Sequence, residues 1–189
     1  MKTLKSKGFS DLKDKKILDI GCGDGNTLRN FIQYGASPEN CFGIDLLPDR
    51  IQQASRLSPN LHFTCGDASS LPFKDAIFDI VLQYTVFTSI FDQDMKKNIA
   101  DEMKRVLKHE GIIVWYDFFV NNPRNPNVRG VKQQEVRSLF KGYDIQIYFL
   151  TLAPPLVRLL APVSLTFCHI LEKLPILCTH HLAIIRKLG

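Results

Sequence analysis

The sequence lacks several patterns that mark specialised protein classes. Its five cysteines are odd in number and none are spaced as CxxC, which argues against a disulfide framework and a structural zinc site. It has no internal repeat and no low-complexity segment. With 45% apolar and 23% charged residues, the 189-residue chain has an ordinary globular composition. We therefore expect a single domain over residues 1–189, with reduced thiols, in the cytoplasm.

Long apolar runs are also missing. No apolar segment follows the N-terminal lysines, so a secretory signal is not expected. The longest uncharged apolar run, residues 159–171, is interrupted by Pro162 and is shorter than the ~20 residues that cross a bilayer. We expect no transmembrane segment, and we expect this run to form a buried helix.

Positive charge is concentrated at the N-terminus. The chain has 24 Lys and Arg against 19 Asp and Glu, a net charge of +5. Residues 1–16 hold six lysines and two aspartates. Such a basic tail, over residues 1–15, is typical of a solvated terminus and less often of a nucleic-acid partner, so nucleic acid is not the expected partner.

Strand and helix patterns alternate through the first two thirds of the chain. Short apolar runs predict strands over residues 16–20, 41–46, 61–65, 77–83 and 112–118. Helical spacing predicts helices between them, with Pro48 at a first helical position and Asp92 as an N-cap. Gly111 is expected to end the helix that follows Asp92. This alternation predicts an α/β, doubly wound fold with a mostly parallel sheet.

The rhythm changes after Asn125. The pattern predicts a helix near residues 133–140 and an extended run over 144–152. A proline-punctuated apolar helix over 156–174 and a last strand near 182–186 follow. The two extended runs suggest a hairpin-like pair that closes one sheet edge. The apolar helix is expected to pack as core, or alternatively to roof an acceptor pocket.

A glycine-rich turn follows the first expected strand and reads Asp19-Ile20-Gly21-Cys22-Gly23-Asp24-Gly25. Glycine permits a sharp turn and close approach of a ligand, and the helix start behind it presents free N–H groups. Ligands of open α/β sheets bind at the carboxyl ends of the strands, so this turn is the first candidate site.

Acidic residues around the turn favour a cationic ligand. Asp19 and Asp24 flank it, and a like charge at about 5 Å costs on the order of 3 kcal/mol at an effective dielectric of about 20. This repulsion opposes the pyrophosphate of a dinucleotide and favours the ammonium and sulfonium groups of S-adenosylmethionine. The glycine spacing is also one residue tighter than the GxGxxG of nicotinamide-binding folds.

Further acids follow the next two expected strands. Asp45 ends the second strand, where a carboxylate can accept hydrogen bonds from both hydroxyls of a ribose. Asp67 follows the third strand, where it can accept from an adenine amino group while Ala68 leaves room for the ring. Each alone is as typical of a turn or a cap, but together they mark one edge of the sheet.

Residues 15–118 resemble the class I S-adenosylmethionine-dependent methyltransferases of the type-11-like group. The matching segments are ILDIGCGDG, GIDLLPDRI, GDASSLPF, FDIVLQYTVF and LKHEGIIVWYDF. The resemblance implies a Rossmann-like, seven-stranded sheet with the last strand antiparallel, and S-adenosylmethionine as cofactor. It implies cofactor contacts from Asp19, Gly21, Gly23, Gly25, Asp45, Asp67, Ala68 and Gln83.

Catalysis then falls to residues near the fourth and fifth strands. Methyl transfer depends mainly on alignment, but a hydroxyl or protonated amine acceptor needs a base. Asp117 is our candidate base, and Tyr84 is our candidate for orienting the acceptor. Many relatives carry a histidine shortly after the fourth strand, whereas residues 85–89 here read TVFTS. No imidazole base can therefore be carried over.

Residues 119–189 are expected to form the acceptor side. Arg124, Arg129 and Arg158 are candidates to grip a carboxylate or phosphate of a small-molecule acceptor. The apolar segment favours a hydrophobic acceptor. The segments LAPP and NNPRNPNVRG resemble small bacterial methyltransferases linked to surface glycans, so a glycan is a second candidate acceptor. No metal site is expected.

Three other functions stay open. They are an RNA methyltransferase, a nicotinamide-dependent oxidoreductase and a non-catalytic cofactor-binding protein. The sequence lacks the Asn/Asp-Pro-Pro-aromatic motif of base amino-group methylation after the fourth strand, where Gln83 and Tyr84 stand instead. The oligomeric state is left open.

Overall fold

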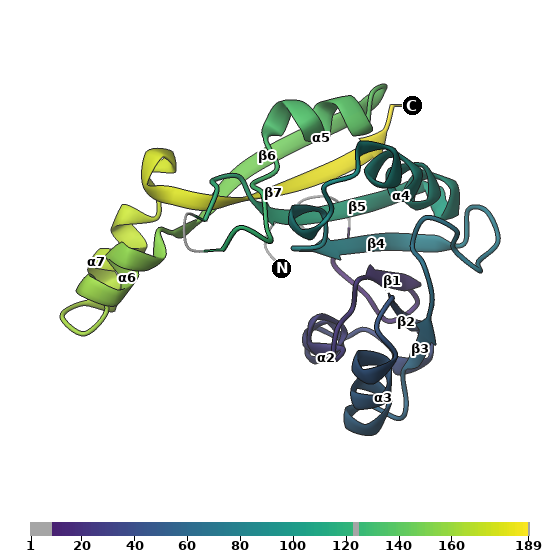
Figure 1. Cartoon of the computed structure of the whole chain (residues 1–189). Helices are drawn as coiled ribbons and strands as arrows, with labels where there is room; N and C mark the ends of the chain where they lie inside the picture. The colour runs from purple at the N-terminus through teal and green to yellow at the C-terminus, as the bar shows by residue number, and fades with distance from the viewer. Residues whose placement is uncertain (1–8, 123–124, 189) are drawn as a thin grey trace.

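The computed structural model describes residues 9–122 and 125–188 (Figure 1). Its strands are β1 (Ile17–Ile20), β2 (Cys41–Asp45), β3 (His62–Cys65), β4 (Phe78–Tyr84), β5 (Leu107–Phe118), β6 (Tyr143–Leu152) and β7 (Cys178–Lys187). Its α-helices are α2 (Asn26–Gln33), α3 (Pro48–Leu57), α4 (Gln93–Val106), α5 (Gln133–Leu139), α6 (Pro154–Leu160) and α7 (Leu165–Leu171). Short 3₁₀ helices are η1 (Pro38–Asn40), η2 (Phe87–Ser89) and η3 (Pro175–Leu177).

All seven strands form one sheet in the order β3-β2-β1-β4-β5-β7-β6. The pairs from β3 to β5 are parallel, and β7 is antiparallel to both β5 and β6. The strand order reverses between β1 and β4, which places the topological switch point at the turn after β1. The α/β class and the mostly parallel sheet with an antiparallel last strand are confirmed.

Two apolar clusters cover the two faces of the sheet. On one face, Ile99 and Met103 of α4 and Val136 of α5 pack against buried residues of the central strands. On the other, Leu28 and Phe31 of α2 are fully or almost fully buried with the remaining side chains of the same strands. Helices on both faces explain why the parallel strands are continuous apolar runs rather than alternating ones.

The helix boundaries follow their caps. The Asp92 carboxylate accepts hydrogen bonds from the backbone N–H groups of Asp94 and Met95, so the predicted N-cap is confirmed. The predicted end of this helix at Gly111 is wrong. The helix ends at Val106 because Leu107 already pairs with Phe78, and Gly111 lies inside β5 next to a shift in register.

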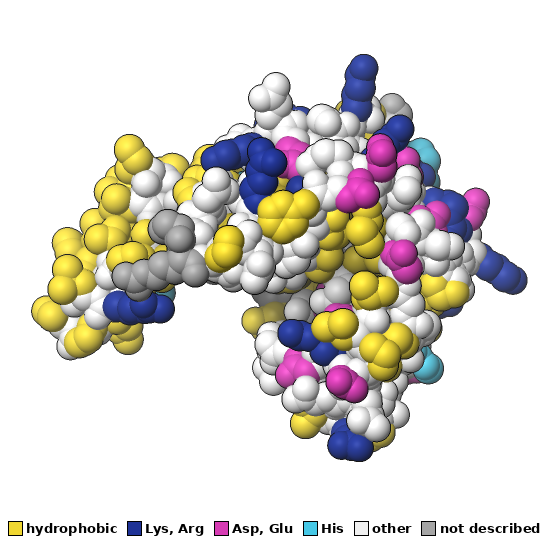
Figure 2. All heavy atoms as spheres, viewed as in Figure 1, with side chains coloured by type: hydrophobic (Ala, Val, Ile, Leu, Met, Phe, Trp, Pro, Cys, Tyr) yellow, Lys and Arg dark blue, Asp and Glu magenta, His cyan; other side chains and the backbone are white. Residues whose placement is uncertain are grey.

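The expectation of one buried apolar helix in the C-terminal part is also wrong. The chain forms two short helices, α6 and α7, joined by a turn at Pro162. Residues 153–177, here called the apolar hairpin, project from the sheet at the left of the view in Figure 1. Figure 2 shows hydrophobic side chains gathered over this projection. Pro162 interrupts the helical hydrogen bonding, and the long β6–β7 pair carries the segment away from the core.

The pairing of β6 with β7 confirms the predicted hairpin at one sheet edge, and α5 confirms the helix predicted near residues 133–140. All five cysteines are unpaired. Among the described residues, no helix is long and apolar enough to span a membrane.

Candidate cofactor and acceptor site

The glycine turn lies at the carboxyl end of β1, between β1 and α2. Gly21, Gly23 and Gly25 all have positive φ angles, of 67°, 55° and 82°. A Cβ on Gly21 would lie 2.3 Å from the Val86 side chain, and one on Gly25 would lie 2.7 Å from Phe63. Both the backbone conformation and the packing therefore require glycine, which gives a tight cradle ahead of the N-terminus of α2.

Asp19 lies at the end of β1 and is almost completely buried, at 1% exposed. Neither of its carboxylate oxygens has a hydrogen-bond partner among the described residues. Burial, followed by the nearby charge of Asp45, raises the pKa of Asp19 to about 8. A buried carboxyl group without a partner is costly, and it marks a place where a donor or a cation would be bound.

Asp45 supports the turn from the end of β2. Its Oδ2 atom accepts a hydrogen bond from the Gly23 N–H at 2.9 Å, and its Oδ1 atom accepts from the Leu47 N–H at 3.0 Å. Each oxygen has a second lone pair, so the carboxylate can still accept from the hydroxyls of a ribose. Asp45 thus joins the glycine turn to the start of α3.

Asp24 is less available than its position in the sequence suggests. Its carboxylate accepts from the Asn26 N–H at 3.0 Å and forms an ion pair with Arg29 at 3.4 Å. With Asp19 holding a proton near neutral pH, the turn does not present two free negative charges. The repulsion of a pyrophosphate is therefore weaker than the sequence indicates, and Asp19 would favour a cation only by losing its proton when the cation binds.

The loop after β3 contains Asp67 and Ala68. The Asp67 side chain is exposed and accepts a hydrogen bond from the Ser69 N–H at 2.8 Å, which closes a turn. Ala68 packs against the buried cluster on the α4 side of the sheet. Asp67 is thus held in a fixed turn beside β2, as the Gly66 N–H donates to the Asp45 carbonyl oxygen at 3.0 Å.

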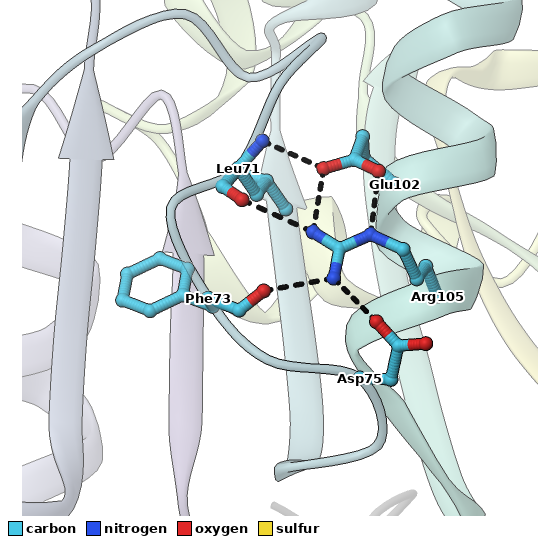
Figure 3. Close-up of polar contacts among 5 residues, drawn as sticks. All are labelled: Leu71, Phe73, Asp75, Glu102 and Arg105. Carbon is cyan, nitrogen blue, oxygen red and sulfur yellow. Dashed lines mark hydrogen bonds and ion pairs between the residues drawn. The ribbon is translucent and has the colours of Figure 1, made fainter.

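A side chain that the sequence did not single out anchors this loop. Arg105 of α4 donates to the carbonyl oxygens of Leu71 and Phe73, and it pairs with Asp75 and Glu102 (Figure 3). The Glu102 carboxylate in turn accepts from the Leu71 N–H at 2.6 Å. The hydrogen bond from Arg105 lowers the pKa of Glu102. These guanidinium hydrogen bonds of Arg105, here called the Arg105 fork, hold the loop that carries Asp67 against the α4 helix.

Gln83 and Asp117 lie on the opposite face of the sheet from their neighbours Tyr84 and Tyr116. Both are fully buried, and the Gln83 amide donates to the Asp117 carboxylate at 3.0 Å. Burial raises the pKa of Asp117 to about 7, opposed by hydrogen bonds from Gln83 and Thr88. The cofactor contact of Gln83 and the role of Asp117 as a base stay predictions, since both side chains are enclosed.

A cavity of about 480 Å³ lies between α2 and the sheet. It begins at Asn26, the residue after Gly25, and its walls include Phe31, Tyr84 and Tyr116. The rings of the two tyrosines are 5.4 Å apart, and the Tyr116 hydroxyl lies 2.6 Å from that of Thr151. Burial and the nearby Asp19 raise the pKa of Tyr84 to about 12, so its hydroxyl keeps its proton at neutral pH.

The arginines expected to grip an acceptor are not brought together there. Arg129 and Arg158 are both exposed, and neither lines the cavity. Arg158 lies on α6, in the apolar hairpin. Arg124 lies outside the described residues. Among the described residues, no cluster of His, Cys, Asp or Glu has the arrangement of a metal site.

Comparison with known proteins places this geometry in a family. The model of a family described as "Methyltransferase domain" matches residues 18–115, which run from β1 into β5. Norajmaline N-methyltransferase of Rauvolfia serpentina is 34% identical over 139 residues, which are 70% of this chain and 45% of that protein. The tRNA N(3)-cytidine methyltransferase METTL2 of Gallus gallus is 29% identical over 112 residues, which are 54% of this chain and 30% of that protein.

The chain spans about half the length, or less, of these curated relatives. The crystal structure of a SAM-dependent methyltransferase from Methanosarcina mazei has the same fold, with a TM-score of 0.71 at 21% identity over 93% of both chains. The match of the family model confirms the resemblance seen in the sequence. The chain therefore belongs to the methyltransferase domain family, and that membership implies S-adenosylmethionine as its cofactor.

Proposed function

We propose that this chain transfers a methyl group from S-adenosylmethionine to a small, largely apolar molecule. The observation that carries this proposal is the cavity beside the glycine turn, whose walls are mainly aromatic and aliphatic, with Asn26, Thr27 and Asn30 as polar side chains. None of the described residues that line it is charged. An acceptor in this space would be held by apolar contact and oriented by a few polar groups.

The residues around the turn fit the cofactor. The three glycines leave room for close approach of a ligand to the backbone, and Asp45 has lone pairs free for a ribose. Asp19 is a buried carboxyl without a partner, as an ammonium or sulfonium group requires. We propose that Asp67 and Ala68, in the loop after β3, contact the adenine. When bound, S-adenosylmethionine supplies an electrophilic methyl group on a sulfonium.

The chain's own contribution to the reaction is positioning. Tyr84 and Tyr116 line the cavity, and Tyr84 keeps its hydroxyl proton at neutral pH because of its raised pKa. The two tyrosines are suited to orient a lone pair of the acceptor and to exclude water from it. Asp117 lies on the opposite face of the sheet from the cavity. We therefore propose that it holds a proton there and does not touch the acceptor.

An RNA acceptor is the second candidate, since the chain is also similar to a tRNA methyltransferase. An RNA acceptor requires cationic or phosphate-binding residues beside the site. The described walls of the cavity hold no Lys or Arg, and Arg129 lies outside it. A small-molecule acceptor of the kind named for the Rauvolfia relative is therefore favoured, with a glycan as a more polar variant.

Calorimetric titration with S-adenosylhomocysteine and with NAD tests the cofactor. We expect micromolar binding of the first and none of the second, and we expect Asp45→Ala to weaken binding by roughly tenfold or more. Asp49→Ala, which removes an exposed carboxylate of α3, is the matched control and should bind normally. Binding of NAD alone would overturn the proposal in favour of an oxidoreductase.

The acceptor is tested with radiolabelled cofactor and a fractionated cell extract. Label in the low-molecular-weight organic fraction supports the proposal, and label in RNA supports the second candidate. Cofactor binding without labelling of any fraction would identify a non-catalytic binding protein. Tyr84→Phe should lower the rate of labelling while leaving the affinity for S-adenosylhomocysteine unchanged.

A further inference from the structure

For its length, the apolar hairpin exposes more large hydrophobic side chains than the rest of the described residues. It holds seven of the fifteen large apolar side chains that are exposed among the described residues. Val163 is 84% exposed, Ile176 is 90% exposed and Leu159 is 70% exposed. Contiguous apolar patches of this kind mark surfaces that bind a protein or a membrane.

The tip of the apolar hairpin, residues 159–168, is suited to an environment without water. No charged side chain occurs in residues 159–168. In the turn, the backbone N–H groups of Ala161, Val163 and Ser164 donate to carbonyl oxygens within the hairpin, and Pro162 has no N–H. Few donors are therefore left to be stripped of water if the tip is buried in an apolar medium.

The flanks of the tip are basic. The apolar hairpin contains two Lys or Arg and one Asp or Glu. Arg158 and Lys173 flank the tip and are exposed. The one acid of the hairpin, Glu172, is engaged internally, since it accepts from the Thr151 N–H at 2.9 Å.

We propose that the apolar hairpin inserts into the surface of an anionic lipid bilayer. The tip is too short to span the bilayer, and its exposed apolar residues lie on both helices and the turn rather than on one stripe. Such a shape suits the headgroup and acyl boundary, with Arg158 and Lys173 at the level of the anionic headgroups. A second copy of this chain is the alternative occupant.

The topology places the bilayer near the candidate site. The strands β1, β4, β5 and β6 run in the same direction, and the hairpin follows β6 at the edge where the carboxyl ends of these strands lie. The glycine turn is at the same edge. Insertion of the apolar hairpin would therefore orient the glycine turn toward the membrane. The proposal itself does not depend on methyl transfer.

Flotation with lipid vesicles tests the proposal. The full chain, without cofactor, is mixed with phosphatidylcholine vesicles that contain or lack phosphatidylglycerol. We expect binding that is stronger with phosphatidylglycerol and that weakens at high salt. The double variant Val163→Glu, Leu165→Glu should lower the partition coefficient by roughly tenfold or more, and Arg158→Gln by roughly fivefold on anionic vesicles only.

Leu57→Glu is the matched control, because it makes the same kind of change at an exposed leucine of α3. It should leave vesicle binding unchanged, and all variants should keep the melting temperature of the parent. Absence of binding to either vesicle at low salt would overturn the proposal. So would a concentration-dependent dimer in sedimentation that the tip variant abolishes and that does not bind vesicles, which would identify a second copy as the occupant.

Discussion

Residues 17–118 and the apolar hairpin, residues 153–177, use their apolar side chains in opposite ways. In the first region the apolar runs become strands that are buried on both faces, as in Ile17–Ile20. In the second region the most apolar stretch of the sequence projects from the sheet and stays exposed. Apolar composition thus predicts burial only where the topology supplies a second layer to pack against.

Paired leucine substitutions sharpen this comparison most strongly. Leu28→Ala removes a fully buried side chain of α2, and it should lower the free energy of unfolding by about 3 to 4 kcal/mol. Leu159→Ala changes an exposed side chain of the apolar hairpin and should cost under about 0.5 kcal/mol. Urea denaturation of both variants measures the difference. Equal losses would show that the hairpin packs as core.

A second pair separates backbone strain from packing at the glycine turn. Gly21→Ala combines a positive φ with a contact to Val86 and should cost about 2 to 3 kcal/mol. Gly35 also has a positive φ, but nothing lies within 4 Å of its added Cβ. Gly35→Ala should therefore cost about 1 kcal/mol. Similar losses in thermal denaturation would contradict the close packing of Val86 on the turn.

Arg105→Ala tests whether α4 holds the loop that carries Asp67. Loss of the fork should lower the free energy of unfolding by about 1 to 2 kcal/mol and weaken binding of S-adenosylhomocysteine. Arg105→Lys should rescue little, because an ammonium cannot reproduce the planar fork. Arg56→Ala, an exposed arginine of α3, serves as control. Unchanged affinity in Arg105→Ala would limit the fork to a structural role.

The pH dependence of stability reports on the buried acids of the first region. The raised pKa of Asp19, about 8, means that the folded state keeps a proton that the unfolded chain has lost. Its contribution to stability therefore falls as the pH rises from about 4 to about 8, and Asp117 acts in the same direction up to about pH 7. Asp19→Asn should flatten the dependence of the free energy of unfolding on pH, measured by urea denaturation between these pH values. The slope should change by at most about 1.4 kcal/mol per pH unit, the value for one proton.

The sequence predicted the parts that depend on local pattern. The strand runs, the cap at Asp92, the glycine turn and the edge pair of β6 and β7 all follow from periodicity and turn chemistry. The resemblance supplied the antiparallel last strand. The wrong boundary at Gly111 and the wrong burial of the apolar hairpin both come from tertiary pairing, which no local pattern contains.

The electrostatics of the site were the least predictable part. The sequence shows two acids beside the turn, but the ion pair of Asp24 with Arg29 and the protonation of Asp19 arise only in the folded chain. For Arg105 the sequence indicates only an ion pair with Glu102, three residues earlier on the same helix. Its bonds to the loop carbonyls of Leu71 and Phe73, more than thirty residues away, could not be read from that spacing.

Proton release on binding of S-adenosylhomocysteine tests the central claim most directly. Calorimetry near pH 7 in two buffers of different ionisation enthalpy counts the protons released. A ligand ammonium that pairs with Asp19 favours its ionised form, so we expect release of a proton, affinity that rises toward about pH 8, and loss of both effects in Asp19→Asn. Binding without proton release in the parent chain, or release that persists in Asp19→Asn, would contradict the account.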